Sequence, residues 1–483
     1  MSQKQMLSSS PQGGFSLIGL QPALGWTVIL GFLLFTTLGI VAGLGSITRY
    51  GFPVGCFVVG LFLYLRYPIL YLGFNWWTWF LTPLVARLVD FRGEWDPSRL
   101  MIVSSYLVTL ITAITFFRYF PKSYRHGGLP FILAFVGVAY GFLIGLINNP
   151  LVGTVRALLD WITPIFFGFH VFIHWRDYPE YRQNILRTFT WCVLITGAYG
   201  VVQYLVAPEW DKLWIIKTGL VTNGKPEPLG IRVFSTMHSP GPFANVMLAG
   251  LLLLFNGQGF VRIPASVVGY LSFLLCLVRS AWGGWIVGMF TLLTSLKSRL
   301  QMRLIITMLV MVLCVLPFAT VEPFSDIISD RLTSITNIQN DTSYYERSAR
   351  YNEKLNLALS NLLGNGIGSV YFVNDKGRLE QVVLDSGVLD TFFTLGWFGA
   401  IPYLGGIALL VINLFRSKEG RSDTFLSASR AIGLGIFSQL WLGSNMLGLS
   451  GIILWSFFGI AMAARRYYQH QRALILHNIQ QQN

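Results

Sequence analysis

The chain has 483 residues, of which 53% are hydrophobic and only 12% are charged, and its formal net charge at pH 7 is +14. Soluble globular proteins carry about 25% charged residues, so a soluble dehydrogenase, hydrolase or nucleic-acid reader is excluded as a description of the whole chain. The positive charge has to be located along the chain before it indicates any partner.

Apolar runs of nearly bilayer-spanning length recur along the chain. A membrane-spanning helix needs about 20 mostly apolar residues, so the runs predict an all-α polytopic membrane protein with about 12–14 transmembrane helices. The predicted helices cover residues 24–44, 51–65, 67–84, 101–119, 130–147, 153–174, 187–206, 240–256, 263–278, 281–296, 303–320, 389–414, 427–446 and 450–464. The 51–84 region could instead be one long helix followed by an interfacial segment, because Trp76, Trp77 and Trp79 suit a membrane interface.

Basic residues predict the orientation, since Lys and Arg near helix ends are retained on the cytoplasmic side. With the N-terminus inside, 19 of the 35 Lys and Arg residues face the cytoplasm with only four of the 21 Asp and Glu residues. This predicts a multi-pass protein of the bacterial cytoplasmic (inner) membrane with both termini in the cytoplasm. The excess positive charge then indicates contact with anionic membrane lipids and no nucleic-acid partner.

The same orientation divides the chain into seven parts and exports both long polar intervals. The predicted parts are a cytoplasmic segment (1–23), an N-terminal transmembrane bundle (24–206), an extracytoplasmic loop (207–239), helices that carry Arg279 (240–320), a large extracytoplasmic loop (321–388), C-terminal transmembrane helices (389–464) and a solvated cytoplasmic tail (465–483). Most of the dense polar chemistry lies in the two exported loops, so function is expected there.

Two clusters place an arginine at the rim of an apolar helix. Residues 230–242 contain Arg232 and His238 and lead through Pro and Gly into a helix, whose unpaired N–H groups would favour a phosphate. Arg279 stands in a short break between two apolar runs, where an ionisable residue is a candidate for function. A capped helix entrance and a turn arginine that snorkels to the headgroups are the plain structural interpretations.

Two further clusters lie in and after the large loop. Glu346, Arg347 and Arg350 open a predicted amphipathic helix that leads to residues 363–368, whose Gly364, Gly366 and Gly368 permit a tight, exposed turn near a ligand. Asp385 and Asp390 flank the start of the next helix, where a carboxylate could deprotonate an acceptor hydroxyl. Helix capping and an internal salt bridge are the alternatives for these two residues.

The cysteines and histidines predict neither a metal site nor a disulfide framework. Cys56, Cys192, Cys276 and Cys314 are far apart in apolar runs and are expected to be packing residues. His170 and His174 could share a helix face, but no Glu or Cys lies near them in the sequence.

Taken in order, these clusters resemble the O-antigen ligase and O-antigen polymerase superfamily of bacterial glycan-assembly enzymes. The resemblance covers roughly residues 232–399 and rests on the run at 232–241, the Arg279-Ser280 break, the 363–368 segment and the closing run at 395–399. Where ligases of the family carry a His-Asn pair, this chain has Asp385-Ser386; in this it looks closer to the polymerases.

The resemblance implies a GT-C-like helical fold, a polyprenyl-diphosphate-linked glycan as donor, and no metal or other cofactor. A glycan, lipid or protein would be the acceptor, in surface polysaccharide assembly and with partners from that machinery. Carried over by position, Arg232 and Arg279 would contact the donor diphosphate and Asp385 would occupy the place of the base. The expected substrate-binding residues are Arg347, Arg350, Glu346, His238, Gly366 and Gly368.

A transporter or flippase of lipid-linked glycans is the alternative. Its cations would bind the same substrate, but an inverted-repeat transporter should show corresponding broken helices in both halves. Here the arginine-bearing break and the large loop both fall in the second half, which favours an enzyme.

Overall fold

A computed structural model describes residues 22–482 of the chain, except for 257–258, 297–300, 303–304, 307–308, 310–354, 357, 370, 374–378, 382–385 and 416–422. The described part is helical apart from two three-residue strands. The first half of the chain forms α1 (Ala23–Val41), α2 (Gly45–Arg66), α3 (Pro68–Arg92), η1 (Leu100–Ile102), α4 (Val103–Leu110), α5 (Ala113–Ser123), η2 (Tyr124–His126), α6 (Leu129–Asn148), α7 (Leu151–Ile173), η3 (Trp175–Asp177) and α8 (Tyr178–Val206).

The second half contains shorter helices and the antiparallel strand pair. Its elements are α9 (Glu209–Thr218), η4 (Val221–Asn223), α10 (Pro240–Leu254), α11 (Arg262–Leu275), α12 (Arg279–Ser295), β1 (Tyr371–Val373), β2 (Leu379–Gln381), α16 (Gly387–Phe415), α17 (Thr424–Phe437) and α18 (Gly448–Gln482).

Eight of the described helical segments are long and apolar enough to cross a membrane, so the chain is a multi-pass membrane protein. They are Ala23–Val41, Gly45–Arg66, Leu100–Ser123, Leu129–Asn148, Leu151–Ile173, Trp175–Val206, Gly387–Phe415 and Gly448–Gln481. Three shorter apolar helices, α10, α11 and α17, accompany them. The predicted count of 12–14 is therefore not reached by this criterion among the described residues, and most of the predicted helix 303–320 lies outside them.

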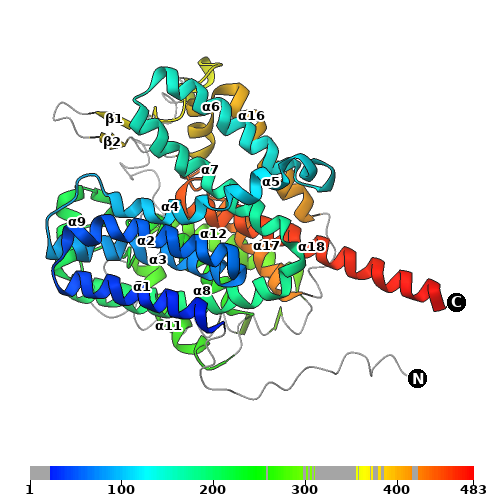
Figure 1. The fold of residues 1–483 in the computed structure, drawn as a ribbon, viewed down its shortest axis with the longest axis horizontal. Helices are drawn as coiled ribbons and strands as arrows, with labels where there is room; N and C mark the ends of the chain where they lie inside the picture. Colours follow the sequence, from blue (N-terminus) through cyan, green and yellow to red (C-terminus); the bar gives the residue numbers. More distant parts are fainter. Residues whose placement is uncertain are drawn as a thin grey trace.

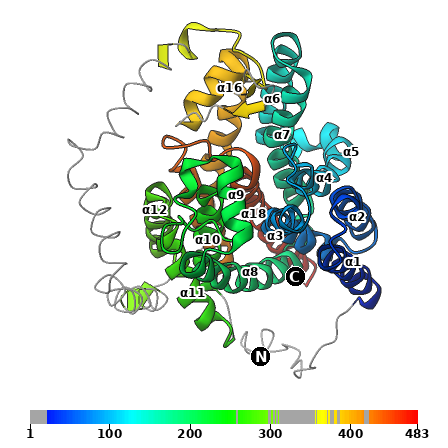
Figure 2. The ribbon, with the colours of Figure 1, turned by 90° about the vertical axis from the view of Figure 1, so that its left-hand side faces the viewer.

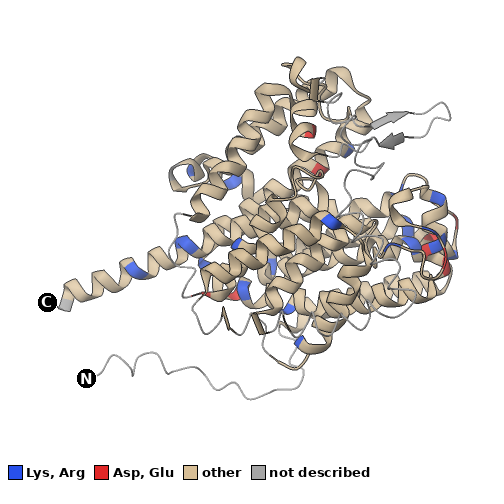
Figure 3. Ribbon diagram, turned by 180° about the vertical axis from the view of Figure 1, so that it is seen from behind, with Lys and Arg blue, Asp and Glu red and all other residues tan. Residues whose placement is uncertain are grey.

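Most helices run side by side along one direction (Figure 1). The short helix α9 lies at one end of this bundle, here named the α9 end, and α18 leaves the bundle at the opposite end, here named the tail end. In the view along the bundle, α6, α7 and α16 stand beside the group that contains α3, α8, α10 and α18 (Figure 2). Lys, Arg, Asp and Glu lie mostly toward the two ends (Figure 3), as expected where the middle meets hydrocarbon.

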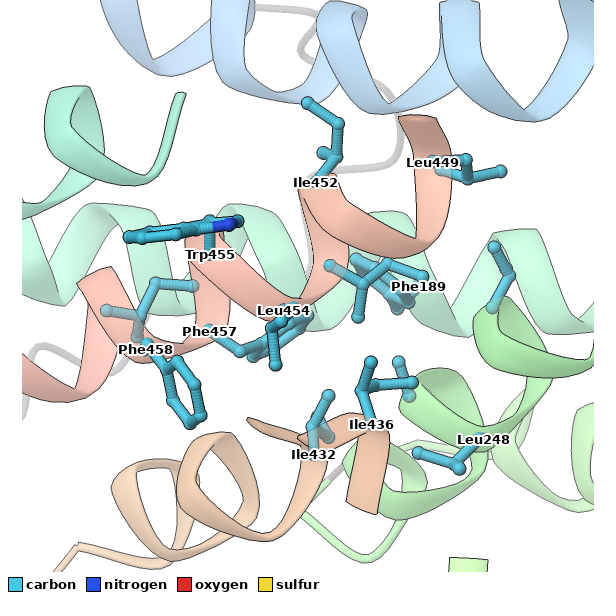
Figure 4. Packing of buried hydrophobic residues seen from close by; sticks show 14 of the residues in the cluster. Phe189, Leu248, Ile432, Ile436, Leu449, Ile452, Leu454, Trp455, Phe457 and Phe458 are labelled. Atoms are coloured by element: carbon cyan, nitrogen blue, oxygen red, sulfur yellow. The ribbon is translucent and has the colours of Figure 1, made fainter. Parts of the chain in front are cut away.

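The core is built around the first half of α18, which is almost completely buried. Phe457 and Leu454 face Phe189 of α8 and Ile432 of α17 (Figure 4). Glycines let α7 and α18 approach closely, because a Cβ built on Gly459 would lie 2.3 Å from the backbone oxygen of Gly168. Small residues at helix contacts are typical of membrane proteins, where dispersion contacts drive packing.

The tryptophan-rich region differs from its predicted place at the membrane interface. The chain breaks at Tyr67, just before Pro68, so this region forms the two helices α2 and α3. Trp76 is fully buried and packs on Phe167 and Phe189 at 5.5 and 5.0 Å between ring centroids. Trp76 is thus a core residue of the bundle. Trp79 is buried as well.

One predicted helix is shorter than expected, and two segments outside the predicted helices contain helical residues. The predicted helix 427–446 ends at Phe437, because the polar residues that follow form hydrogen bonds to neighbouring helices. The predicted tail 465–483 continues α18 as an exposed helix to Gln482. The predicted loop 207–239 contains α9 and η4, since Pro208 and the acidic first turn of α9 favour a helix start.

The three described cysteines, Cys56, Cys192 and Cys276, are free and buried, which confirms their prediction as packing residues; Cys314 lies outside the described residues. His170 binds the Thr115 hydroxyl through Nδ1 at 2.8 Å, and His174 Nδ1 lies 2.9 Å from the backbone oxygen of His170. No group of three potential metal ligands occurs among the described residues.

Candidate functional site

The predicted run at residues 230–239 forms a shaped loop at the α9 end. The backbone N–H groups of Phe234 and Ser235 both donate to the side-chain oxygen of Gln203 on α8, at 3.0 and 2.7 Å. Ser235 has a positive φ of 52°, and its hydroxyl donates to the backbone oxygen of Thr196. Side chains of α8 therefore hold this loop in a conformation that its own sequence would rarely adopt.

A buried ion pair lies directly beneath the loop. The guanidinium of Arg87, near the end of α3, pairs with the carboxylate of Asp211 on α9, and both side chains are fully buried. Asp211 also accepts hydrogen bonds from Tyr199 and Gln203, each at 2.8 Å, while Arg87 donates to the backbone oxygen of Ser235 at 2.6 Å. Because each charge has several partners, the pair can be buried and can fix α3, α8, α9 and the loop together.

His238, at the end of the loop, stands among three arginines. Its backbone oxygen accepts a hydrogen bond of 3.1 Å from the indole of Trp214 on α9. Burial and, after it, the positive charges of Arg99, Arg87 and Arg156 together lower the pKa of the His238 imidazole to about 4. The imidazole is therefore neutral at pH 7, and the net charge of this group of side chains is carried by guanidiniums.

The surroundings of Arg99 and Arg156 place them at the same end of the bundle. Arg99 lies in the segment between α3 and η1, with its Cζ atom 5.3 Å from the ring centroid of Trp214. Arg156 lies in the second turn of α7. We call Arg99, Arg156 and His238, with the Arg87 ion pair behind them, the His238 cluster.

The structure also brings Arg232 to the helix break that precedes Arg279. Arg232 Nη2 donates to the backbone oxygen of Leu277 at 2.9 Å, and the N–H of Val233 donates to that of Leu275 at 3.2 Å. Residues 276–278 separate α11 from α12, which begins at Arg279. Arg232 thus lies against the end of the break, two residues before Arg279 in the sequence.

Two carboxylates lie near the beginning of α18. Asp390 is buried in the first turn of α16 and accepts hydrogen bonds from Ser444 at 2.8 Å and Thr394 at 3.1 Å. Asp160 accepts a hydrogen bond from the phenol of Tyr106. A Cβ built on Gly448, the first residue of α18, would lie 3.3 Å from Asp160 Oδ1.

The α7 helix connects one of these carboxylates to the His238 cluster. Arg156 and Asp160 are four residues apart on α7 and therefore share one face of that helix. Tyr106 and Asp160 are both only half-buried. This helix face carries a cation and, one turn further on, a partly accessible carboxylate.

A chain of buried amides joins α10 to the segment that binds Asp390. The side chain of Asn245, on the helix that directly follows His238, donates to Asn445 and Ser450, each at 2.9 Å. It accepts a hydrogen bond from Gln439 at 3.1 Å. Hydrogen bonds thus join α10, which follows His238 in the sequence, to the segment whose Ser444 binds Asp390.

The glycines at 364–368 serve backbone packing, which corrects the expectation of an exposed turn. Gly364, Gly366 and Gly368 are buried and have φ values of 77°, 83° and 100°. A Cβ on Gly366 would lie 2.3 Å from the backbone nitrogen of Gly145 on α6, and one on Gly364 would lie 2.2 Å from that of Gly396, where α16 kinks. The segment 364–368 therefore packs between α6 and α16.

The other predicted site residues fall outside the described part of the chain. These are Asp385, Glu346, Arg347 and Arg350. Sequence reasoning missed Arg87, Arg99, Arg156 and Asp160, although a charged residue inside an apolar run was a usable signal for Arg156 and Asp160. Arg99 gave no such signal, because its role depends on the contact between a connecting segment and α9.

Compared with known proteins, the chain matches no protein-family model and no curated protein sequence.

Proposed function

We propose that the protein is a membrane glycosyltransferase that polymerises or transfers polyprenyl-diphosphate-linked oligosaccharides. It would act on the extracytoplasmic face of the membrane, in the assembly of a surface polysaccharide. The observation that carries this proposal is the His238 cluster, in which the charges of Arg99, Arg87 and Arg156 act on one imidazole at one end of a membrane-spanning bundle.

The charge of the His238 cluster suits a diphosphate. Arg87 pairs with Asp211 within the fold, and we assign the contacts with phosphate oxygens to Arg99 and Arg156. Arginine binds phosphate through a planar fork of donors. A site at the water interface of the bundle suits a donor with a lipid chain and a charged headgroup.

The reaction would be a displacement at the anomeric carbon of the donor sugar. The acceptor oxygen forms the new bond to that carbon, and the bond to the diphosphate breaks with its electron pair staying on the phosphate oxygen. Arginines stabilise the negative charge that develops on this leaving group. The proton of the acceptor hydroxyl passes to a carboxylate.

Three carboxylates are candidates for that proton acceptor. Asp385 follows from the sequence, whereas Asp160 and Asp390 are the described carboxylates near the beginning of α18. Asp160 is favoured among the described two, because it shares a helix face with Arg156 and its side chain is partly accessible.

The proposal is tested with the purified full-length protein and a polyprenyl-diphosphate-linked oligosaccharide, without metal or nucleotide. Glycan length and released polyprenyl diphosphate are measured together. Longer lipid-linked glycans with stoichiometric release of lipid diphosphate are the expected result. Transfer to an added lipid or protein acceptor without lengthening would instead indicate a ligase.

No turnover with several donors would contradict an enzymatic function. Movement of the intact donor across the bilayer of a proteoliposome would then indicate a transporter. Release of the diphosphate without any transfer would show hydrolysis and would also contradict the proposal.

A further inference from the structure

Two arginines meet on one buried tryptophan at the tail end of the bundle. The Cζ atom of Arg176 lies 4.6 Å from the ring centroid of Trp175, and the Cζ atom of Arg466 lies 5.1 Å from it. Arg466 also lies 6.0 Å from the ring centroid of Phe172, and the ring of His470 packs on Trp175 at 5.2 Å. The turn between α7 and α8 and the exit of α18 thus share one aromatic and basic cluster, here named the Trp175 cluster.

The cluster holds like charges close together. The two guanidiniums contact the same ring, so they lie within about one Debye length of each other at 0.1 M salt. Contact with an indole face orients a cation but does not neutralise it. An anion between the two guanidiniums would relieve their repulsion.

Two acidic groups near this end of the bundle, among the described residues, have other surroundings. Asp423 accepts hydrogen bonds from the hydroxyls of Tyr178 and Tyr468 and caps α17 through two backbone N–H groups. Asp177 follows Arg176 directly and compensates part of its charge. Arg466 lies on another element, two residues beyond the last fully buried residue of α18.

The cluster lies where α18 changes from buried to exposed, and we take this change to mark the level of the lipid headgroups. Ala463 and Ala464 are buried, whereas residues 469–470 and the helix beyond Gln471 are exposed. Cations at this level beside a spanning helix attract anionic lipids, and basic pockets between helices bind their head groups.

We propose that Arg176 and Arg466, held on Trp175, bind the phosphate of an anionic phospholipid headgroup in the leaflet at the tail end. Each guanidinium can donate two hydrogen bonds to phosphate oxygens, and the indole keeps both forks in place. The inference does not depend on the proposed glycosyl transfer, because it concerns the opposite end of the bundle.

The test uses the full-length protein in nanodiscs of phosphatidylcholine with a titrated fraction of phosphatidylglycerol. The number of lipids retained after transfer to detergent is measured by native mass spectrometry, and the apparent Tm is measured in parallel. The double variant Arg176→Gln/Arg466→Gln should bind phosphatidylglycerol about thirtyfold more weakly, given about a fivefold effect for each cation. Arg472→Gln, a change of a basic residue further along α18, is the matched control and should leave binding unchanged.

A second variant separates a binding defect from a folding defect. Arg176→Lys/Arg466→Lys keeps both charges and should show intermediate binding, because a point charge replaces the fork. All variants should keep the wild-type Tm in pure phosphatidylcholine. Equal retention of phosphatidylcholine and phosphatidylglycerol, or unchanged phosphatidylglycerol binding in the Gln double variant, would overturn the inference. Full stabilisation by millimolar inorganic phosphate in detergent would overturn the lipid assignment and indicate a soluble anion instead.

Discussion

The protonation of His238 contributes to how the stability of the α9 end responds to pH. An unfolded chain binds a proton on histidine near pH 6.5, whereas burial and the neighbouring arginines lower the pKa of His238 to about 4 in the folded protein. Between these values the unfolded state binds more protons, so the free energy of unfolding increases as the pH rises. This contribution is complete above about pH 6.5 and is lost as the pH falls toward 4.

We therefore expect the apparent Tm to fall between pH 6.5 and 4.5, with uptake of about one proton on unfolding attributable to this residue. The variant His238→Gln should lose that part of the pH dependence, because it cannot titrate. Thermal unfolding of both proteins in the same detergent over this range checks the prediction. An identical pH dependence in the two proteins would show that His238 is already protonated or exposed in the folded state.

The three candidate bases, Asp160, Asp385 and Asp390, can be distinguished by replacing each one and measuring the pH dependence of turnover. A general base that is replaced by its amide loses the acidic limb of the profile together with about 100- to 10,000-fold in rate. We expect this from either Asp160→Asn or Asp385→Asn. Asp390→Asn should mainly lower the Tm, because both Asp390 oxygens hold hydroxyl partners within the fold. A retained acidic limb in both of the first two variants would show that neither carboxylate is the base.

At the scale of elements, the kinked α16 and the glycine segment before it act as one unit. The N–H groups of Asn365 and Gly366 donate to the backbone oxygens of Phe393 and Thr394, at 3.0 and 2.9 Å. The N–H of Ile367 donates to the backbone oxygen of Gly141 on α6 at 2.8 Å. This backbone contact replaces side-chain packing, which is why glycines occupy it.

Gly366→Ala should therefore be strongly destabilising. The new Cβ would lie 2.3 Å from a backbone atom of α6 at a φ of 83°, which costs about 1–2 kcal/mol for the left-handed conformation alone. Gly283→Ala on α12 is the matched control, because a Cβ there meets nothing within 4 Å. A Tm of Gly366→Ala that equals the Tm of this control would contradict the packing shown here.

At the scale of the whole molecule, hydropathy predicted most helices but not their contacts. Helices such as α6 and α7 begin and end close to their predicted limits, since a bilayer-length apolar run has few alternatives. The burial of Trp76 was not predictable, because it depends on which helices meet its ring. The helix α17 ends earlier than predicted, and the segment after it contacts the amide of Asn245. These contacts likewise depend on which helices lie close together in the fold.

In the candidate site as well, residues that the sequence itself marks were predictable, whereas contacts between distant segments were not. Arg232 and the break before Arg279 were identifiable, because an arginine at the edge of an apolar run is unusual and costs free energy in a membrane. Arg87 and Asp211 are 124 residues apart, and only the folded bundle pairs them. Sequence reasoning found the arginines near helix breaks. It missed Arg87 and Arg156, which lie on helices, and Arg99, which lies in a connecting segment.

The predicted orientation places the α9 end of the bundle outside the cell and the tail end in the cytoplasm. Lys225, near η4, has a largely exposed side chain at the α9 end, and Arg472 is exposed on the α18 tail. In a cysteine-free background, Lys225→Cys should react with a membrane-impermeant maleimide added to intact cells. Arg472→Cys should react only after the membrane is opened. Labelling of both positions from the same side would contradict a bundle with its α9 end outside.

The central claim is that the His238 cluster binds the diphosphate of a lipid-linked glycan during transfer. The most direct measurement is turnover of a polyprenyl-diphosphate-linked oligosaccharide by Arg99→Gln and Arg156→Gln, with Arg472→Gln as control. Each of the first two variants should lose about 100-fold or more in kcat, because one donor to the developing charge is removed, while the control keeps wild-type activity. Wild-type turnover in both cluster variants, at unchanged Tm, would contradict the claim.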